Sequence, residues 1–394
     1  MNICRLFGKE PSKTKVLVAM SGGVDSSLVA VLLKKLGYNL IGCTLQLAQP
    51  SCGLGACCTG RDLIDVQKIC EEIDIPHVLV KARDEFKQQV IQRTVDTYAK
   101  GLTPSPCVWC NSKVRFDFLL KAAFEHGCDG FVTGHYAYMS CDEQKENDTN
   151  SANKELTYYI NAGIDPTKDQ SYFLSMLKPE MLKYIRFPLG NMHKTLVRRL
   201  ARRFGIHVAD KGDSQDLCFV KDTYTQTLWN LAPQIFKPGS IVNTRGEVIG
   251  EHDGVVQYTI GQRKGLGAVS GSNIRKSSNQ VNCATAEPIY VVDIMPESNE
   301  VMIGGKEDGL VNKLILENVN MFCDFIEGMF VMAKVRARSE TVLARLWEKG
   351  RVLEFLSPIY HPARGQFAIM YIDRKLVACG LISDFERYVR RKIS

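Results

Sequence analysis

Apolar and polar positions alternate along the first half of the chain in a way that predicts strands and helices in turn. Short apolar runs with the composition of buried parallel strands separate longer segments whose apolar residues recur at helical spacing. The predicted strands are residues 16–20, 39–47, 77–80 and 130–134, and the predicted helices are residues 24–35, 62–73, 86–98 and 116–126. This alternation predicts an α/β fold, a doubly wound parallel sheet of Rossmann-like type with ligands at the carboxyl ends of its strands.

The pattern changes after about residue 238. Short β-like runs punctuated by Gly, Asn and Pro replace the helical periodicity, as in residues 239–246 and 289–294. Runs at this spacing predict small antiparallel sheets or a barrel. We therefore expect three domains, which are an α/β domain at 1–221, a small central β domain at 222–288 and a C-terminal β-barrel at 289–394. Residues 142–155 are a polar insertion, expected at the surface.

Composition narrows the class of protein. A chain of 394 residues, 45% hydrophobic and 24% charged, has enough apolar material for two or three globular domains. Its formal charge of +7 fits an anionic partner only mildly. Fourteen cysteines, several of them isolated, favour a reducing compartment. Apolar runs are too short to span a membrane and residues 1–15 lack the core of a secretory signal, so we expect a cytoplasmic protein without a membrane partner.

The strongest candidate site is the loop between the first predicted strand and the first predicted helix. The apolar run 16–20 breaks into Ser21-Gly22-Gly23 before a helix opens at Val24. Two glycines let the backbone approach an oxyanion, and the free N–H groups and the helix dipole then face it. The loop lacks the lysine of the motif G-x-x-x-x-G-K-[ST], so ordinary γ-phosphate transfer is not indicated. The sequence predicts a phosphate-binding loop of another kind.

Two cysteines stand in segments that suggest chemistry. Cys110 precedes a predicted helix at residues 113–126, where the positive end of a helix dipole lowers a thiol pKa, so it is a candidate nucleophile. Cys218 follows about a hundred residues later, flanked by acidic groups. The single C-x-x-C that ends at Cys110 leaves open a structural zinc half-site, a redox pair or two unrelated thiols. A Gly-rich loop at 51–58 carries three more thiols, for which we favour a mobile loop near the nucleotide over a metal site.

Basic and polar clusters add weaker signals. The segment 186–210 predicts a helix with an apolar face of Leu196, Leu200 and Phe204 and four arginines at 198, 199, 202 and 203, which suit phosphate contacts or a merely solvated face equally. Residues 165–173 form a polar cluster that a solvated turn also explains. Residues 334–338 predict a strand with two arginines on one face.

Seven motifs, taken in order, closely resemble those of the tRNA-specific 2-thiouridylases, a family of PP-loop ATP pyrophosphatases. They are residues 21–27 (SGGVDSS), 110–111 (CN), 133–136 (TGHY), 168–174 (KDQSYFL), 187–190 (FPLG), 213–219 (DSQDLCF) and 258–267 (YTIGQRKGLG). The resemblance covers roughly residues 14–385. Enzymes of that family place sulfur on C2 of the wobble uridine, U34, after ATP adenylates its C2 oxygen with release of AMP and pyrophosphate.

The resemblance implies site residues, cofactors and partners. It implies ATP, with Mg²⁺, at Ala19, Met20, Ser21, Gly22, Gly23, Val24, Asp25 and Ser26, with Leu45 and Gly134 beside the nucleotide. It implies Cys110 as the nucleophile and Cys218 as the carrier of a persulfide, loaded by a sulfur donor or relay protein, with a disulfide left between the two. It implies tRNA contacts at Ser105, Pro106, Cys107, Lys168, Asp169, Gln170, Arg336 and Ala337.

One position departs from the family pattern and keeps alternatives open. Many members resemble Asp-x-x-Cys-Asn where this chain has Cys107, so acid–base duty is not carried over to residue 107. Cys107, Cys110 and Cys218 can instead be ligands to three irons of a [4Fe–4S] cluster, although we favour the persulfide. Another PP-loop enzyme, such as an ammonia-using synthetase, has no need of the two cysteines. A non-catalytic tRNA-binding protein with a structural metal is the remaining alternative.

Overall fold

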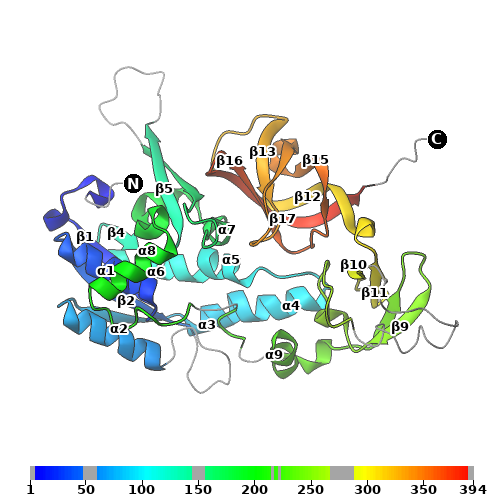
Figure 1. Ribbon diagram of the computed structural model, residues 1–394, viewed down its shortest axis with the longest axis horizontal. Helices are drawn as coiled ribbons and strands as arrows, with labels where there is room; N and C mark the ends of the chain where they lie inside the picture. The colour runs from blue at the N-terminus through cyan, green and yellow to red at the C-terminus, as the bar shows by residue number, and fades with distance from the viewer. Residues whose placement is uncertain are drawn as a thin grey trace. The chain divides into compact units, whose positions relative to one another are not determined.

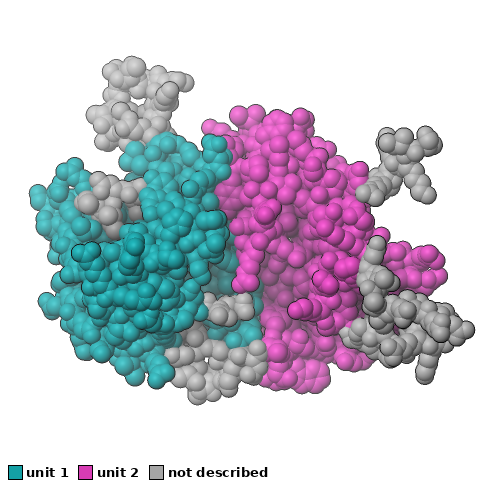
Figure 2. Space-filling model, in the orientation of Figure 1, with its two compact units in different colours: residues 1–91, 106–222, 373–376 teal, residues 92–105, 223–372, 377–394 magenta. Residues whose placement is uncertain are grey.

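The computed structural model describes residues 5–47, 60–143, 156–213, 217–220, 223–266 and 288–388. These divide into two compact units (Figure 2). Unit 1 comprises Met1–Ile91, Pro106–Asp222 and Asp373–Leu376, and unit 2 comprises Gln92–Ser105, Thr223–Ile372 and Val377–Ser394. The thiol-rich loop 51–58, residues 214–216 of the second cysteine motif and residues 144–155 of the polar insertion lie outside the described residues.

Unit 1 contains the predicted doubly wound sheet (Figure 1). Five parallel strands run in the order β3-β2-β1-β4-β7. Their bounds are β1 Lys15–Ala19, β2 Asn39–Gln46, β3 His77–Lys81, β4 Gly130–Val132 and β7 Ile185–Arg186. The strand order reverses between β1 and β4, so the crevice that binds ligands in such sheets lies at the carboxyl ends of these two strands.

The described helices of unit 1 are α1 Val24–Lys35, α2 Gly60–Glu72, α3 Arg83–Phe86, α5 Pro106–Cys110, α6 Phe116–Glu125, α7 Ser171–Leu174 and α8 Lys194–Arg203, with π-helical residues Lys87–Gln92 and Asn111–Arg115. Of these, α1, α2 and α6 contact strands of this sheet, and α8 packs against α1. The predicted helix 86–98 is thus divided, and its last part is α4 Arg93–Ala99 of unit 2. In α8 the fully buried apolar residues are Val197 and Ala201, and Leu200 and Phe204 of the predicted face are half-buried against the same core cluster.

Shorter elements complete unit 1. An antiparallel hairpin joins β5 Ala137–Glu143 to β6 Leu156–Ala162. Residue Lys375, which begins β17 Lys375–Arg387, pairs with Asn161 of β6. The 3-10 turns of the two units are Leu6–Gly8, Pro11–Lys13, Pro179–Tyr184, Pro188–Asn191, Pro233–Ile235, Val255–Gln257, Glu307–Gly309 and Glu348–Gly350.

Unit 2 contains a small sheet and a closed barrel. Helix α9 Tyr224–Leu231 precedes a sheet of order β10-β11-β8-β9, whose strands are β8 Gly239–Val242, β9 Val248–His252, β10 Tyr290–Met295 and β11 Glu300–Gly304. The six antiparallel barrel strands are β12 Leu310–Met321, β13 Met329–Lys334, β14 Val342–Trp347, β15 Val352–Tyr360, β16 Phe367–Ile372 and β17, and pairing of β12 with β17 closes them. Residues 290–304, expected in the barrel, contain β10 and β11 of this small sheet instead, where β10 pairs with β11 and β11 pairs with β8.

Two further sequence expectations meet the structure here. The strand expected at 334–338 ends at Lys334, and the chain then turns, with the Ser339 N–H donating to the Arg336 carbonyl at 3.1 Å. Among the described helices, none combines the length and the apolar character that a bilayer crossing requires.

Candidate active site

The loop after β1 forms a tight turn whose carbonyl groups are tied back. Gly22 has φ +73°, and a Cβ there would lie 2.7 Å from the Asp62 carbonyl oxygen, so both conformation and space require glycine. The Gly23 carbonyl accepts bonds from the Ser26 and Ser27 hydroxyls at 3.2 and 2.8 Å. Since the first N–H groups of a helix have no intrahelical acceptor, those of α1 are left to face the carboxyl end of β1.

The two other predicted nucleotide contacts lie at the same edge of the sheet. Gly134 follows β4, and a Cβ on it would lie 2.9 Å from the Ser26 backbone nitrogen, so the end of β4 touches the start of α1. Leu45 lies two residues beyond Cys43, which is in register with Ala19 at the end of β1. The described residues therefore place the loop, Leu45 and Gly134 around the switch point. A glycine-lined cradle of this kind fits the phosphates of ATP.

A buried lysine joins the loop to two distant segments. Lys194, the first residue of α8, is 7% exposed. Its ammonium contacts both carboxylate oxygens of Asp25 at 2.8 and 2.7 Å and the carboxylate of Asp213 at 2.9 Å. The Tyr136 hydroxyl donates to Asp25 at 2.7 Å. Burial and the negative charge of Asp25 both raise the pKa of Tyr136, so the phenol keeps its proton.

Asp213 is the second centre of this network. It pairs with Lys168 at 2.8 Å and with Arg198 at 2.7 Å, in addition to Lys194. Burial by itself would raise the pKa of Asp213, but hydrogen bonds from Lys168 and Lys194 outweigh it and hold that pKa well below its usual range. Asp213 therefore stays ionised, pairs directly with Lys168 and is joined to Asp25 through Lys194.

Sequence reasoning missed Lys194 as a site residue. It considered only the arginines of α8 as candidates for phosphate contacts, and in the structure two of them bond to other groups of the protein. Arg198 donates to the carbonyls of Ala209 and Lys211 at 2.9 and 3.0 Å, and Arg202 pairs with Asp210 at 2.7 Å. One signal was present, because a lysine in the first turn of a helix faces the positive end of the dipole and needs an acidic partner.

The candidate nucleophile lies inside a helix, which corrects the sequence expectation. Helix α5 begins at Pro106, has Cys107 in its first turn and ends at Cys110. The chain then continues directly into the π-helical residues Asn111–Arg115. Cys110 is 6% exposed. The next residue, Asn111, donates its side-chain amide to the Phe173 carbonyl at 3.0 Å, which holds α5 beside α7. The dipole argument therefore applies to Cys107 more than to Cys110.

Cys218 lies in a short turn of the same unit. The Val220 N–H donates to the Leu217 carbonyl at 3.0 Å, and the Cys218 side chain is half-buried. Phe219 is 2% exposed and packs edge-on against Phe86, with ring centroids 6.3 Å apart. Throughout the described part of the chain, no three His, Cys, Asp or Glu side chains are grouped to hold a metal ion.

The residues expected to contact tRNA are mostly engaged within the protein. Asp169 accepts bonds from the Gly163 and Ser171 N–H groups at 3.0 and 3.1 Å, and the Gln170 side chain accepts from the Tyr136 N–H at 2.9 Å. With the Lys168 ion pair, these bonds make 165–171 a half-buried, ordered turn. Ser105 and Pro106 are buried. In unit 2, Arg336 donates to the carbonyls of Ile260 and His361, and Ala337 is half-buried.

His135, beside Gly134, gives a testable pH dependence. Its ring packs against Phe116 and Phe187 and lies 2.7 Å from the Thr133 hydroxyl. Burial and the positive charge of Arg115 lower the pKa of His135 to about 3. The unfolded chain takes up this proton from about pH 6.5 downward, but the folded chain does so only near pH 3. The free energy of unfolding therefore decreases as the pH is lowered from about 6.5 to about 3.

We expect the wild type to lose up to about 1.4 kcal/mol more unfolding free energy per pH unit than His135→Asn between pH 6 and pH 4. Urea unfolding at pH 6, 5 and 4 measures the two slopes. Equal slopes would contradict a neutral, desolvated His135.

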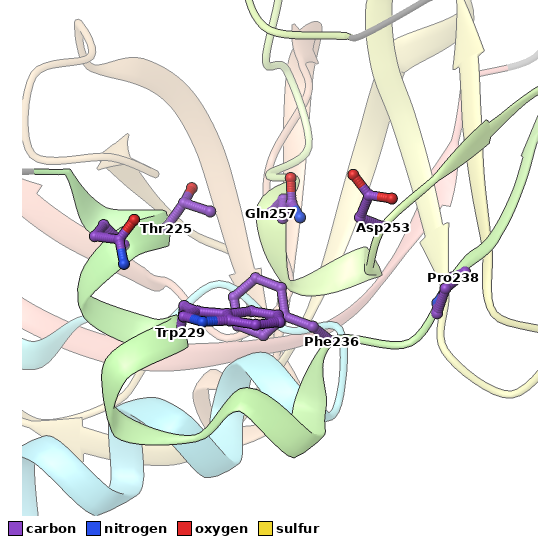
Figure 3. Close-up of a pocket in the computed structure, with 7 residues that line it drawn as sticks. Thr225, Trp229, Phe236, Pro238, Asp253 and Gln257 are labelled. Atoms are coloured by element: carbon purple, nitrogen blue, oxygen red, sulfur yellow. The ribbon is translucent and has the colours of Figure 1, made fainter.

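A surface hollow elsewhere, in unit 2, holds none of these residues. It has a volume of about 480 Å³ and lies between α9 and the turn at Val255–Gln257. Figure 3 shows the rings of Trp229 and Phe236 together in it, and they meet edge to face with centroids 5.0 Å apart. The candidate active site is therefore defined by the backbone cradle and its ion-pair network in unit 1.

Comparison with known proteins finds relatives that match most of the chain. The chain matches the family model described as tRNA methyl transferase HUP domain over residues 14–222 and the one described as tRNA methyl transferase PRC-barrel domain over residues 231–305. It is 43% identical over 332 residues to a tRNA-specific 2-thiouridylase MnmA of Ehrlichia canis, covering 84% of this chain and 83% of that one. It is 39% identical over 385 residues to the protein of that name from Wolbachia pipientis, covering 96% and 97%.

A solved structure is similar at a greater distance. The U34-tRNA thiolase NcsA of Methanococcus maripaludis, with its [4Fe–4S] cluster, shares 18% identity over 60% of this chain and 71% of its own, with a TM-score of 0.33. We infer nothing about the present chain from that likeness. The sheet, the cradle at its switch point and the HUP match define a nucleotide-binding protein of the HUP class. The chain belongs to the tRNA-specific 2-thiouridylase family.

Proposed function

We propose that this protein is an ATP-dependent tRNA uridine 2-sulfurtransferase that converts U34 of the anticodon to 2-thiouridine. The observation that carries the proposal is that unit 1 combines an oxyanion cradle without a P-loop lysine and two motif cysteines, Cys110 and Cys218. A cradle of this kind serves cleavage of ATP to AMP and pyrophosphate. Family membership gives that cleavage its substrate.

The first step activates a poor electrophile. The C2 oxygen of the uridine attacks the α-phosphorus of ATP, which forms an O-adenylated base and releases pyrophosphate. Backbone N–H groups at the start of α1 stabilise the charge on the departing oxygens. Mg²⁺, bound through the phosphates, would neutralise further charge. In this step Ala19 to Ser26 bind phosphates, and Leu45 and Gly134 border the nucleotide.

The second step moves the sulfur. A donor or relay protein leaves a persulfide on Cys218, and its terminal sulfur attacks C2 and displaces AMP. The Cys110 thiolate then attacks the Cys218 sulfur, so that the bond between the two sulfurs breaks and 2-thiouridine leaves. Alternatively, Cys110 first releases sulfide from the persulfide, and sulfide attacks C2. Either order leaves a disulfide between Cys110 and Cys218, which a dithiol must reduce.

In this proposal the target base, U34, is unstacked from the anticodon loop of the tRNA. An anticodon base is reached by enzymes when it is unstacked, so we place U34 in the crevice beside Gly134. Ser105, Pro106, Cys107, Lys168, Asp169 and Gln170 border it, and Arg336 and Ala337 contact another part of the tRNA. A reaction that ends in reduction of a disulfide suits the cytoplasm. The domain boundary at 221 remains part of this proposal.

The direct test uses the whole chain with Mg²⁺-ATP, a persulfide donor and transcribed tRNA that carries U34. We expect 2-thiouridine in the digested tRNA and one AMP for each sulfur transferred. A matched tRNA with C34 is the control and is expected to give neither product. AMP without tRNA thiolation, or ATP cleavage that ignores the tRNA, would point to another PP-loop pyrophosphatase.

A further inference from the structure

Lys211 reaches the phosphate loop from a segment far along the chain. Its ammonium donates to the Gly22 carbonyl at 2.9 Å, to Asp62 at 2.7 Å and to Asp65 at 2.7 Å. The side chain is 30% exposed, and the two carboxylates, on α2, are 19% exposed each. An ammonium has three N–H donors, so these three acceptors account for all of them. Lys211 is therefore saturated where it stands.

The orientation of the Gly22 carbonyl decides what the loop presents to an anion. Two consecutive glycines restrict the peptide between them very little. If that peptide turned over, the carbonyl oxygen would face the phosphate oxygens and repel them. The next carbonyl, of Gly23, is fixed locally by Ser26, Ser27 and the first turn of α1. The Gly22 carbonyl instead takes its bond from a residue 189 positions away.

The charges around Lys211 support a holding role over direct contact with phosphate. Burial would lower the pKa of Lys211, but the bonds to Asp62 and Asp65 outweigh it and raise that pKa, so the ammonium stays charged. Two carboxylates against one ammonium leave the cluster negative, and a phosphate would gain little by approaching it. Lys211 thus acts on the loop through the Gly22 carbonyl.

We propose that Lys211 is a positioning residue for ATP, which holds the Gly22 carbonyl outward and leaves the loop N–H groups turned to the phosphates. The proposal rests on the proposed function only in taking ATP as the ligand. It assigns to the segment before Cys218 a part in the nucleotide half of the reaction. Removal of the bond lets the Gly22–Gly23 peptide sample orientations that oppose phosphate binding.

The test measures binding of Mg²⁺-ATP and of pyrophosphate to the whole chain by calorimetry, without tRNA. We expect Lys211→Met to weaken both about tenfold to a hundredfold, as loss of a charge-assisted bond implies. Lys211→Arg, which keeps a cationic donor, is expected to bind within about threefold of the wild type. Thiolation by Lys211→Met at saturating ATP is expected within about threefold of the wild-type rate, so the effect falls on KM and not on kcat.

Lys68→Met is the matched control. Lys68 lies on α2, as Asp62 and Asp65 do, and its ion pair with Glu72 at 4.0 Å is exposed. It is expected to bind like the wild type. If Lys211→Met does not fold, the variant that combines it with Asp62→Asn and Asp65→Asn takes its place, because it still lacks the ammonium at the Gly22 carbonyl but leaves no unpaired carboxylate. Unchanged ATP affinity, or a fall in kcat at unchanged KM, would overturn the positioning role. If Lys211→Met weakens ATP binding but the wild type transfers no sulfur to tRNA, the positioning role of Lys211 stands and the proposed function is wrong.

Discussion

Replacing either Cys110 or Cys218 by alanine is expected to abolish 2-thiouridine formation, with a loss of at least about a thousandfold. Each thiol supplies a sulfur to a bond that forms and breaks in the proposed transfer, so the remaining thiol cannot substitute. Pyrophosphate release in a single turnover is expected to persist in both variants, because adenylation precedes sulfur chemistry. Mass spectrometry of digested tRNA and a phosphate-release assay measure the two steps separately.

Two further cysteines make this experiment specific. Cys128, which is 6% exposed like Cys110, belongs to none of the seven motifs, and Cys128→Ala is expected to retain activity. Cys107→Ala separates the persulfide from the [4Fe–4S] alternative, since a cluster needs the third thiolate and the persulfide route does not. We expect Cys107→Ala to stay within about tenfold of the wild type. Loss of activity equal to that of Cys110→Ala, in a brown protein purified without oxygen, would favour the cluster.

Lys194→Met is expected to lower the unfolding free energy by about 3 kcal/mol, near the low end for breaking a buried ion pair. Lys194 is 9% exposed in its side chain, and its loss leaves Asp25 and Asp213 facing each other without their shared cation. These carboxylates are 29% and 32% exposed, so water screens part of the penalty. Urea unfolding at pH 7 measures the change.

Neutralising Asp25 tests the cause of that loss. Adding Asp25→Asn to Lys194→Met is expected to recover part of the stability, because Asp25 is then no longer an unpaired carboxylate, while Asp213 keeps its pairs with Lys168 and Arg198. Lys121→Met, which removes only an exposed pair with Glu125 at 3.9 Å, is expected to change stability by less than about 0.5 kcal/mol. A Lys194→Met variant as stable as this control would show that the network contributes nothing to stability.

Local patterns predicted the sheet and the first helix well. The expected bounds of α1, Val24–Lys35, are those of the structure, because an apolar strand ends in two glycines and Gly37 stops the helix. Parallel strands buried on both faces read as continuous apolar runs, so periodicity finds them. The crossover rules for such sheets predict right-handed connections between parallel strands. They do not fix the particular order β3-β2-β1-β4-β7.

What the sequence could not reveal depends on contacts between distant residues. Lys194 meets Asp25 across 169 positions, and Lys211 meets Gly22 across 189. No local pattern contains such pairs. The start of the helix that holds Cys110 is different, because Pro106 stands at its first position and proline there is a recognised start signal. The sequence therefore contained a signal for a helix that begins before Cys110, although the predicted helix began at residue 113.

The hairpin β5–β6 takes its outer partner from almost the end of the chain. The Ala162 N–H donates to the Arg374 carbonyl at 2.9 Å, and Lys375 pairs with Asp142 at 2.6 Å. Arg374 and Ala162 are 212 positions apart. At a translation rate of about 5–20 residues per second, a nascent chain waits roughly ten to forty seconds between making β6 and making these partners. During that interval the end of β6 at Asn161 and Ala162 lacks these partners and is open to pairing with other chains.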